Sequence, residues 1–148
     1  MVNFDKLTAR EILALTIIGE ARGESIEGQV AVGNVIKNRL IKNPIRYKNY
    51  HDVCLRPAQF SCWNIGDPNR PMLEELAHKM ILGEFKPDLY HRQCMFVAQG
   101  IVEDDLIDNT SGAQNYMTNL LFYGEKKPKW ADNARNVNSI GQHVFFNV

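Results

Sequence analysis

A strongly amphipathic pattern opens the chain and runs into a glutamate. Thr8 to Glu11 has the sequence of a capping box, in which a hydroxyl and a carboxylate satisfy the free N–H groups at a helix start. Leu13, Ile17 and Glu20 follow at helical spacing, so Glu20 lies in line with an apolar stripe instead of on the solvated face. Gly23 then breaks the pattern. The sequence therefore predicts a helix that ends close to a carboxyl group set among apolar neighbours.

Three further stretches have helical periodicity. The second predicted helix begins at Ser25, which can cap it, and Asn43-Pro44 ends it. The third ends near Gly83, a residue suited to the turn after a helix, and the fourth opens at Pro87-Asp88 with proline in its first turn. The apolar faces of these helices consist of Val32, Val35, Ile36 and Leu40; of Leu73, Leu76, Ala77, Met80 and Ile81; and of Tyr90, Cys94, Val97, Ala98 and Ile101.

Residues 45–70, between the second and third helices, lack helical periodicity. Aromatic residues are scattered there among proline, asparagine and glycine, which favours loops with one or two short strands in a small hairpin. Residues 116–122 fit a short strand or a turn of helix, and residues 140–146 fit a closing strand. We expect one domain over residues 1–148 with a mainly helical α+β fold, in which a helical body and a small irregular or β lobe flank a cleft, as clefts of this type hold extended substrates.

The composition, 45% hydrophobic and 23% charged, is that of a soluble globular domain. Lys+Arg and Asp+Glu number 17 each, so no net positive field attracts nucleic acid, and we expect no such partner. The N-terminal residues lack the features of a signal peptide, and no stretch is apolar enough to span a membrane. We expect synthesis in the cytoplasm and no stable membrane insertion. The odd number of cysteines, Cys54, Cys62 and Cys94, predicts free thiols.

Glu20 is the candidate general acid. A carboxyl held against apolar neighbours loses hydration, which favours the protonated form that such an acid needs. The alternative is an ordinary helix end with two exposed glutamates, since Glu24 lies one turn further on. Glu24 and Asp108 are candidates for a second carboxylate. Each has another interpretation, Glu24 as a cap or ion-pair partner near Arg22, and Asp108 as the residue that fixes a turn through Thr110.

Other catalytic patterns are missing. The sequence has no His-Glu-x-x-His, and His91-x-x-Cys94 has no matching second pair, so the histidines do not form a metal-binding motif. Gly-x-Ser-x-Gly and a Gly-rich phosphate loop are also absent. We therefore expect neither a metal ion nor a cofactor.

Six short motifs occur in an order that resembles the SleB-like family of cell-wall hydrolases, which includes spore-cortex-lytic enzymes and phage endolysins. The resemblance runs from Leu15 to Phe145, nearly the whole chain, and the order of the motifs makes it specific although each alone is weak. The motifs are Gly19-Glu20-Ala21-Arg22-Gly23-Glu24; Gly28-Gln29-Val30-Ala31-Val32 with Asn38-Arg39; Gln59-Phe60-Ser61 with Trp63; Asp108-x-Thr110-x-Gly112-Ala113-x-x-Tyr116; Pro128-x-Trp130; and Ile140-Gly141-x-His143-x-Phe145.

This resemblance implies a lysozyme-like fold and cleavage of peptidoglycan glycan strands between N-acetylmuramic acid and N-acetylglucosamine. It implies Glu20, the first glutamate of its motif, as the catalytic acid. The family usually acts as a lytic transglycosylase that leaves a 1,6-anhydro product, so the same glutamate, now a carboxylate, takes the proton of the sugar's own C6 hydroxyl and no second carboxylate is needed.

The chain departs from the family pattern in two respects. Asn115 stands where relatives often have a histidine before the tyrosine of the motif. Relatives also often carry a signal peptide or a wall-binding domain, which we do not find in this sequence. The second departure favours a monomeric phage endolysin that another protein releases to the wall for host lysis.

Six residues are candidate substrate contacts: Glu24, Gln59, Ser61, Trp63, Asn115 and Tyr116. Trp63 offers a flat apolar face for a sugar ring, whereas Gln59 and Ser61 offer hydrogen bonds to acetamido groups. Trp63 fits equally well as part of a small core of the lobe, together with Phe60. The Tyr116 hydroxyl is suited to orienting either Glu20 or the 2-acetamido group.

Two other functions stay open. One is a two-carboxylate N-acetylmuramidase, a hydrolase of the lysozyme type. The other is a lysozyme-like module that binds glycan or assembles a phage particle without catalysis. The presence of Glu20 together with Gln59 and Tyr116 favours an enzyme.

Overall fold

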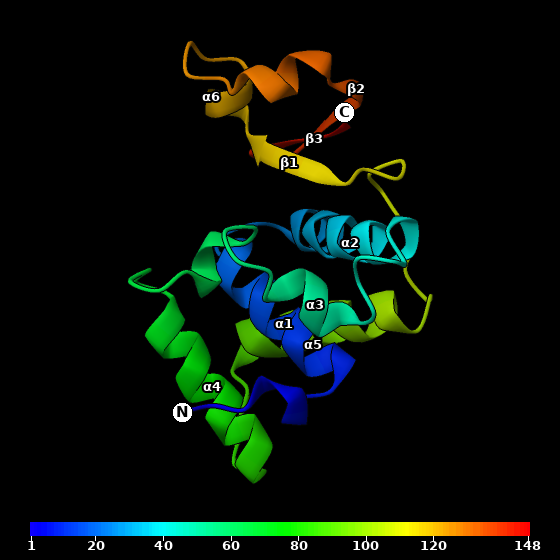
Figure 1. Ribbon diagram of the computed structural model, residues 1–148. Coiled ribbons are helices and arrows are strands. Elements are labelled where there is room, and N and C mark those ends of the chain that lie inside the picture. Colours follow the sequence, from blue (N-terminus) through cyan, green and yellow to red (C-terminus); the bar gives the residue numbers. More distant parts are fainter.

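The computed structural model describes all residues from Met1 to Val148. The helices are α1 (Ala9–Glu20), α2 (Ile26–Lys42), α3 (Tyr50–Cys54), α4 (Arg70–Leu82), α5 (Leu89–Val102) and α6 (Asn119–Phe122), with short 3₁₀ turns η1 (Phe4–Lys6), η2 (Ser61–Trp63) and η3 (Lys129–Asn133). The strands are β1 (Asn115–Thr118), β2 (Arg135–Ile140) and β3 (His143–Asn147). Helix α2 lies between the sheet and the other long helices (Figure 1). The mainly helical α+β fold is therefore confirmed.

The four predicted helices are confirmed, and their caps explain where they begin. In the capping box of α1, the Glu11 amide donates to the Thr8 hydroxyl at 3.1 Å, and the Thr8 amide donates to the Glu11 carboxylate at 2.8 Å. The Ser25 hydroxyl caps α2. Asp88 caps α5 by accepting from the amide of His91, so the preceding proline lies outside that helix and not in its first turn as predicted.

The expected strands within residues 45–70 are wrong, because this stretch forms α3 and η2 instead. Asn49 accepts a hydrogen bond from the amide of Asp52 and starts a single helical turn, which buries Tyr50, Val53 and Cys54 in the main core. Such a turn is too short to show helical periodicity in the sequence. The sheet lies entirely in the last third of the chain, where residues 116–122 provide both predicted forms, the strand β1 followed by α6.

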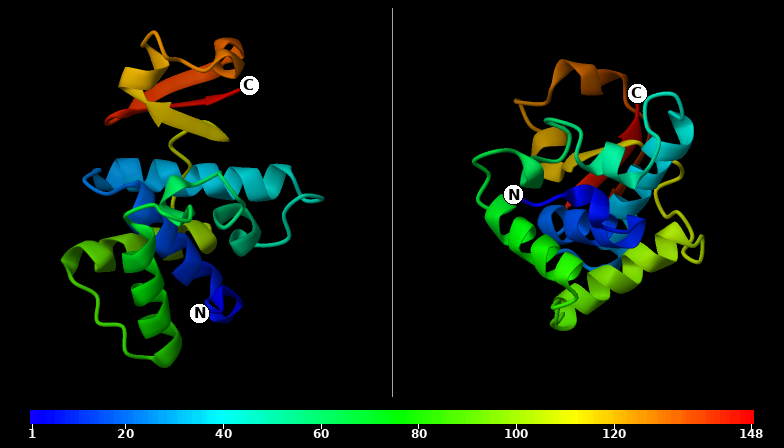
Figure 2. Two further views of the ribbon diagram at one scale, coloured as in Figure 1. Left: turned by 60° about the vertical axis from the view of Figure 1, so that its left-hand side comes forward. Right: turned by 60° about the horizontal axis from the view of Figure 1, so that its bottom comes forward.

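The sheet is antiparallel with the order β1-β3-β2, so β3 is the central strand. Alternate residues of β3 point to opposite faces. Phe145 belongs to the core of the helical body, whereas Val144 and Phe146 belong to a second, smaller core under α6 and η3. The left view of Figure 2 shows the sheet on the far side of α2 from α1, α4 and α5. In this register Tyr116 of β1 lies opposite Phe145 and faces the helices.

The main core contains 29 buried residues and the second core five. Three cysteines are free and buried in the main core, and burial raises the pKa of Cys54 to about 12, that of Cys94 to about 11 and that of Cys62 further. These thiols therefore stay protonated and serve as small apolar residues. None of the helices combines the length and the hydrophobicity that crossing a membrane requires.

Candidate active site

Glu20 is the last residue of α1, and its partly exposed carboxyl group is held by donors from two other segments. The Tyr116 hydroxyl donates to Oε1 at 2.7 Å. At Oε2, the backbone amide of Cys62 donates at 3.0 Å and the Ser61 hydroxyl donates at 3.3 Å. Hydrogen bonds of this kind stabilise a carboxylate and fix its orientation. The carboxyl group is therefore held in one position while part of it stays open to solvent.

The absence of a side chain at Gly19 allows η2 to come this close to α1. A Cβ atom on Gly19 would lie 2.7 Å from Cβ and Sγ of Cys62 and 2.8 Å from Cδ1 of Leu73, closer than packed atoms can come. The glycine therefore permits the contact that brings the amide of Cys62 to Glu20. Gly19 directly precedes Glu20 in the chain, so the glycine of this motif has a packing role next to the candidate acid.

The Tyr116 ring is fixed by two aromatic neighbours on β3. It stacks on Phe145 with ring centroids 5.6 Å apart, and its edge contacts His143 with centroids 5.4 Å apart. Burial, and then the charge of Glu20, raise the pKa of Tyr116 well above its usual value. The hydroxyl therefore stays protonated and remains a hydrogen-bond donor to Glu20.

Glu24 lies in an enclosed ion pair with His143, with 2.5 Å between Oε1 and Nδ1, and the two side chains are only 9% and 15% exposed. Two glycines make room for it, because a Cβ on Gly141 would lie 2.9 Å from Oε2 and one on Gly28 would lie 3.0 Å from Cβ of Glu24. The ion-pair interpretation thus fits, although the partner is His143 and not Arg22. The same enclosure leaves little of Glu24 for the predicted contact with substrate.

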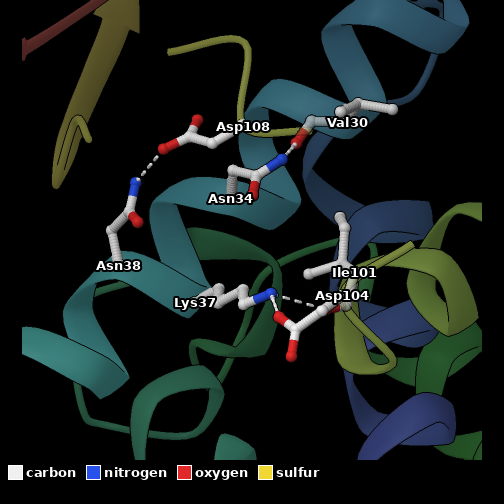
Figure 3. Close-up of polar contacts among 7 residues, drawn as sticks. All are labelled: Val30, Asn34, Lys37, Asn38, Ile101, Asp104 and Asp108. Carbon is white, nitrogen blue, oxygen red and sulfur yellow. Dashed lines mark hydrogen bonds and ion pairs between the residues drawn. The ribbon is translucent and has the colours of Figure 1, made fainter. Parts of the chain in front are cut away.

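Asp108 fixes a turn, as its alternative interpretation predicted. Its carboxylate accepts from the amide and hydroxyl of Thr110 at 2.8 and 2.6 Å and from the amide of Gly112 at 3.0 Å. It also accepts from the side-chain amide of Asn38 at 2.9 Å, the contact that Figure 3 shows. Burial alone would raise the pKa of Asp108, but these hydrogen bonds outweigh it and lower the pKa. All four donors belong to the protein itself, so this carboxylate has a structural role.

Helix α2 also holds the segment that leads from this turn into β1. Asn38 donates to the carbonyl of Ala113 at 3.0 Å, and Nε of Arg39 donates to the carbonyl of Gln114 at 2.7 Å. The two acceptor residues, Ala113 and Gln114, lie shortly before Tyr116 in the chain. The Asn38-Arg39 motif therefore acts through backbone contacts that set the position of the tyrosine.

Trp63 belongs to the core, and the alternative of stacking on a sugar does not fit its position. The side chain is 5% exposed. Its indole nitrogen donates to the Thr16 hydroxyl at 3.0 Å, and the edge of its ring system packs against Phe4. A sugar needs an exposed ring face, and Trp63 has none to offer.

Gln59 and Asn115 lie together at a neighbouring cavity. This hollow has a volume of about 250 Å³, and Gln59 accepts a hydrogen bond there from Nη1 of Arg39 at 3.3 Å. The cavity is lined by Arg39, Asn43, Arg46, Tyr47, Gln59, Gln114, Asn115, Asn147 and Val148. The sequence predicted the two amides but neither arginine as a site residue. It also gave no signal for the amide of Cys62, because a backbone donor has no side-chain pattern.

The structure contains no group of three or more His, Cys, Asp or Glu residues that could hold a metal ion. A carboxyl group that is fixed, partly exposed and surrounded by donors can deliver a proton and then remain stable as a carboxylate.

Comparison with known proteins identifies relatives of the chain. The catalytic domain of the germination-specific lytic transglycosylase SleB from Bacillus anthracis has the same fold, with a TM-score of 0.59 at 22% sequence identity over 94% of this chain and 93% of that one. No curated protein sequence matches significantly. Residues 23–146 match the model of a protein family described as Cell Wall Hydrolase.

The family match and the shared fold confirm the resemblance that the sequence motifs indicated. The matched range begins after Glu20, so the assignment of the acid depends on the geometry described above. The range includes Glu24, the turn at Asp108 and the whole sheet with Tyr116. The chain therefore belongs to the Cell Wall Hydrolase family.

Proposed function

We propose that the protein cleaves peptidoglycan between N-acetylmuramic acid and N-acetylglucosamine as a lytic transglycosylase, with Glu20 as its single acid–base residue. One observation carries this proposal. Of the three candidate carboxyl groups, Glu20 is partly exposed among hydrogen-bond donors, whereas Glu24 is enclosed with His143 and Asp108 is bound within a turn. A mechanism with one carboxyl group fits this arrangement better than one with two. The activity named for the SleB catalytic domain supports the same choice.

In the first step, protonated Glu20 gives its proton to the glycosidic oxygen while the bond from that oxygen to C1 of the muramic acid breaks. C1 gains oxocarbenium character, and Glu20 becomes a carboxylate. The donors from Tyr116 and from the amide of Cys62 stabilise this charge as it forms. The Ser61 hydroxyl can rotate, so it is able to follow the change in protonation.

In the second step, the C6 hydroxyl of the same sugar attacks C1, and its proton passes to Glu20. One C–O bond has broken and another has formed, and the enzyme returns to its protonated state. No water is consumed, which removes the need for a second carboxylate to activate one.

Mass spectrometry of the fragments released from purified peptidoglycan tests this proposal. A lytic transglycosylase releases 1,6-anhydromuramic ends, which are one water lighter than the reducing ends left by a hydrolase. Reducing ends alone would establish the two-carboxylate muramidase instead. If the folded protein binds peptidoglycan but releases no fragments, it is a non-catalytic glycan-binding module.

We further propose that the protein serves as a phage endolysin, because the family that its motifs resemble includes such enzymes. Expression in a bacterial cytoplasm tests this role. The culture should lyse when a membrane-permeabilising protein is produced together with the chain, and it should stay intact with either protein alone. Lysis by the chain alone would show that it reaches the wall by another route.

A further inference from the structure

The cavity beside the active site is rich in hydrogen-bond donors and has no acidic side chain in its lining. Two arginines and five amide side chains surround about 250 Å³ of space. A site for neutral sugar rings normally combines aromatic or apolar faces with a few polar groups. Two guanidinium groups outnumber the one negative group that the lining offers, the terminal carboxylate of Val148, so the cavity keeps a net positive charge that suits an anion.

Arg39 provides a positive charge that no acidic side chain neutralises directly. Its guanidinium donates to the carbonyl of Gln114 and to the side-chain oxygen of Gln59, and it lies 5.1 Å from the centre of the Phe60 ring. All three partners are neutral. Burial lowers the pKa of Arg39, although the nearby charge of Glu20 acts in the opposite direction. Gln114 and Asn115, which line the cavity, stand directly before Tyr116 in the chain, so the cavity borders the active site and has its own positive charge.

Arg46 provides the second charge and is free to bind a ligand. It follows the end of α2, where its amide donates to the carbonyl of Asn43 at 3.1 Å. Its side chain is exposed and makes no hydrogen bond or ion pair within the chain. An arginine of this kind can donate two parallel hydrogen bonds to a carboxylate without breaking a contact within the chain.

We infer that this cavity binds a carboxylate group of the short peptide that the muramic acid of the substrate carries. The inference rests on the proposed function, since it assumes that a peptidoglycan strand occupies the active site. Where a muramic acid carries its peptide, the lactyl carboxyl group of the sugar is held in the amide bond to that peptide, so the peptide is the part that offers a free carboxylate. Gln59 and Asn115 line the cavity and stand in the chain just before Ser61 and Tyr116, the donors to Glu20, so their amides are suited to contacts with the peptide amides.

Comparing two substrates with one charge variant tests this inference. Glycan strands with their peptides, and the same strands after a carbodiimide and ammonia have converted the peptide carboxylates into amides, are digested by the wild type, by Arg46→Gln and by Arg92→Gln. The last is a control for charge, because Arg92 is exposed on α5 and outside the cavity. We expect Arg46→Gln to lower the preference for strands with free peptide carboxylates, as a ratio of kcat/KM values, by about tenfold, the effect of losing one charge-assisted hydrogen bond. The control should keep the wild-type ratio.

Several outcomes would contradict the inference. If the wild type cleaves both substrates equally well, or if Arg46→Gln leaves the ratio unchanged, the cavity does not bind a carboxylate of the peptide. If Arg46→Gln slows the cleavage of both substrates equally, and treatment with hydrofluoric acid that removes phosphodiester-linked polymers abolishes this loss, the bound anion is a phosphate. If the wild type cleaves neither substrate, the proposed function itself fails, which is a separate result. Arg46→Lys should keep part of the preference, because it retains the charge without the planar pair of donors.

Discussion

The carboxylate of Glu24 and the imidazole of His143 form an ion pair of 2.5 Å that solvent hardly reaches. The same imidazole contacts the edge of Tyr116, whose hydroxyl donates to Glu20. The second glutamate of the motif is thus connected to the first one through two aromatic side chains. We therefore expect Glu24 to be a positioning residue, which acts on the proposed acid through other groups.

Replacing Glu24 should therefore weaken the enzyme without abolishing its activity. Glu24→Gln removes the charge opposite His143, and we expect a loss of stability of about 1–3 kcal/mol together with a moderate loss of kcat. Chemical denaturation and turnover measurements on Glu24→Gln, His143→Gln and the double variant form a thermodynamic cycle. The double variant should lose clearly less than the sum of the single losses. Additive losses would show that the two residues act independently.

Replacing Glu20 should abolish the chemistry and preserve the fold. Glu20→Gln keeps the size of the side chain and removes the transferable proton, so we expect lytic activity to fall by at least about a thousandfold, since general acid catalysis is typically worth about 10²–10⁴-fold. Peptidoglycan binding and the circular dichroism spectrum should stay close to those of the wild type. Near-normal lysis would show that another group is the acid, and Glu24 would be the first to examine.

Removing the hydroxyl of Tyr116 should mainly affect turnover. Tyr116→Phe retains the contact with Phe145 but deletes the donor to Glu20, and we expect kcat to fall by about 10–100-fold, as for the loss of one hydrogen bond to a charged group. Tyr123→Phe is a matched control, because Tyr123 is exposed at the end of α6 and does not bond Glu20. Because the pKa of Tyr116 is raised, its ionisation should not limit activity up to about pH 10, the ordinary tyrosine pKa. A change in KM alone would assign the hydroxyl to substrate binding.

Asp108→Asn separates structure from chemistry. The lowered pKa of Asp108 means that its carboxylate stabilises the fold above the ordinary aspartate pKa of about 4, and that this contribution is lost as the pH falls through the lower value in the folded protein. We expect the variant to lose about 1–3 kcal/mol at pH 7, with a smaller difference from the wild type in strong acid. Folded molecules of the variant should still release 1,6-anhydro ends. Complete inactivity of a folded variant would indicate a two-carboxylate mechanism that uses Asp108.

The sequence allowed the helices to be predicted, and Glu20 to be proposed as the acid, because both inferences depend on local patterns. The capping box at Thr8 and the apolar stripe that ends at Glu20 are encoded within a few turns of chain. Strands were predicted within residues 116–122 and 140–146, where β1 and β3 lie, but β2 was missed and strands were wrongly expected within residues 45–70. Most of β2 is exposed, so its sequence lacks the alternation of apolar and polar residues that marks a half-buried strand.

The donors around Glu20 were predictable only in part. Ser61 and Tyr116 were identified as site residues from the family resemblance, and both reach Glu20. The amide of Cys62 could not be predicted, since any residue supplies a backbone N–H. Trp63 was ambiguous because the same side chain suits a core and a sugar-binding surface, and only its burial decides between them.

The two cores have a consequence for how the enzyme fails on heating. Glu20 is anchored in the large core, whereas Tyr116 arrives on a sheet whose outer face is held by only five buried residues. Small units of this kind can open locally while the rest of a protein stays folded. Catalytic competence should therefore disappear several degrees before the helices melt, and cooling should restore it at once. Activity and helical ellipticity followed along the same temperature ramp would reveal the two separate transitions.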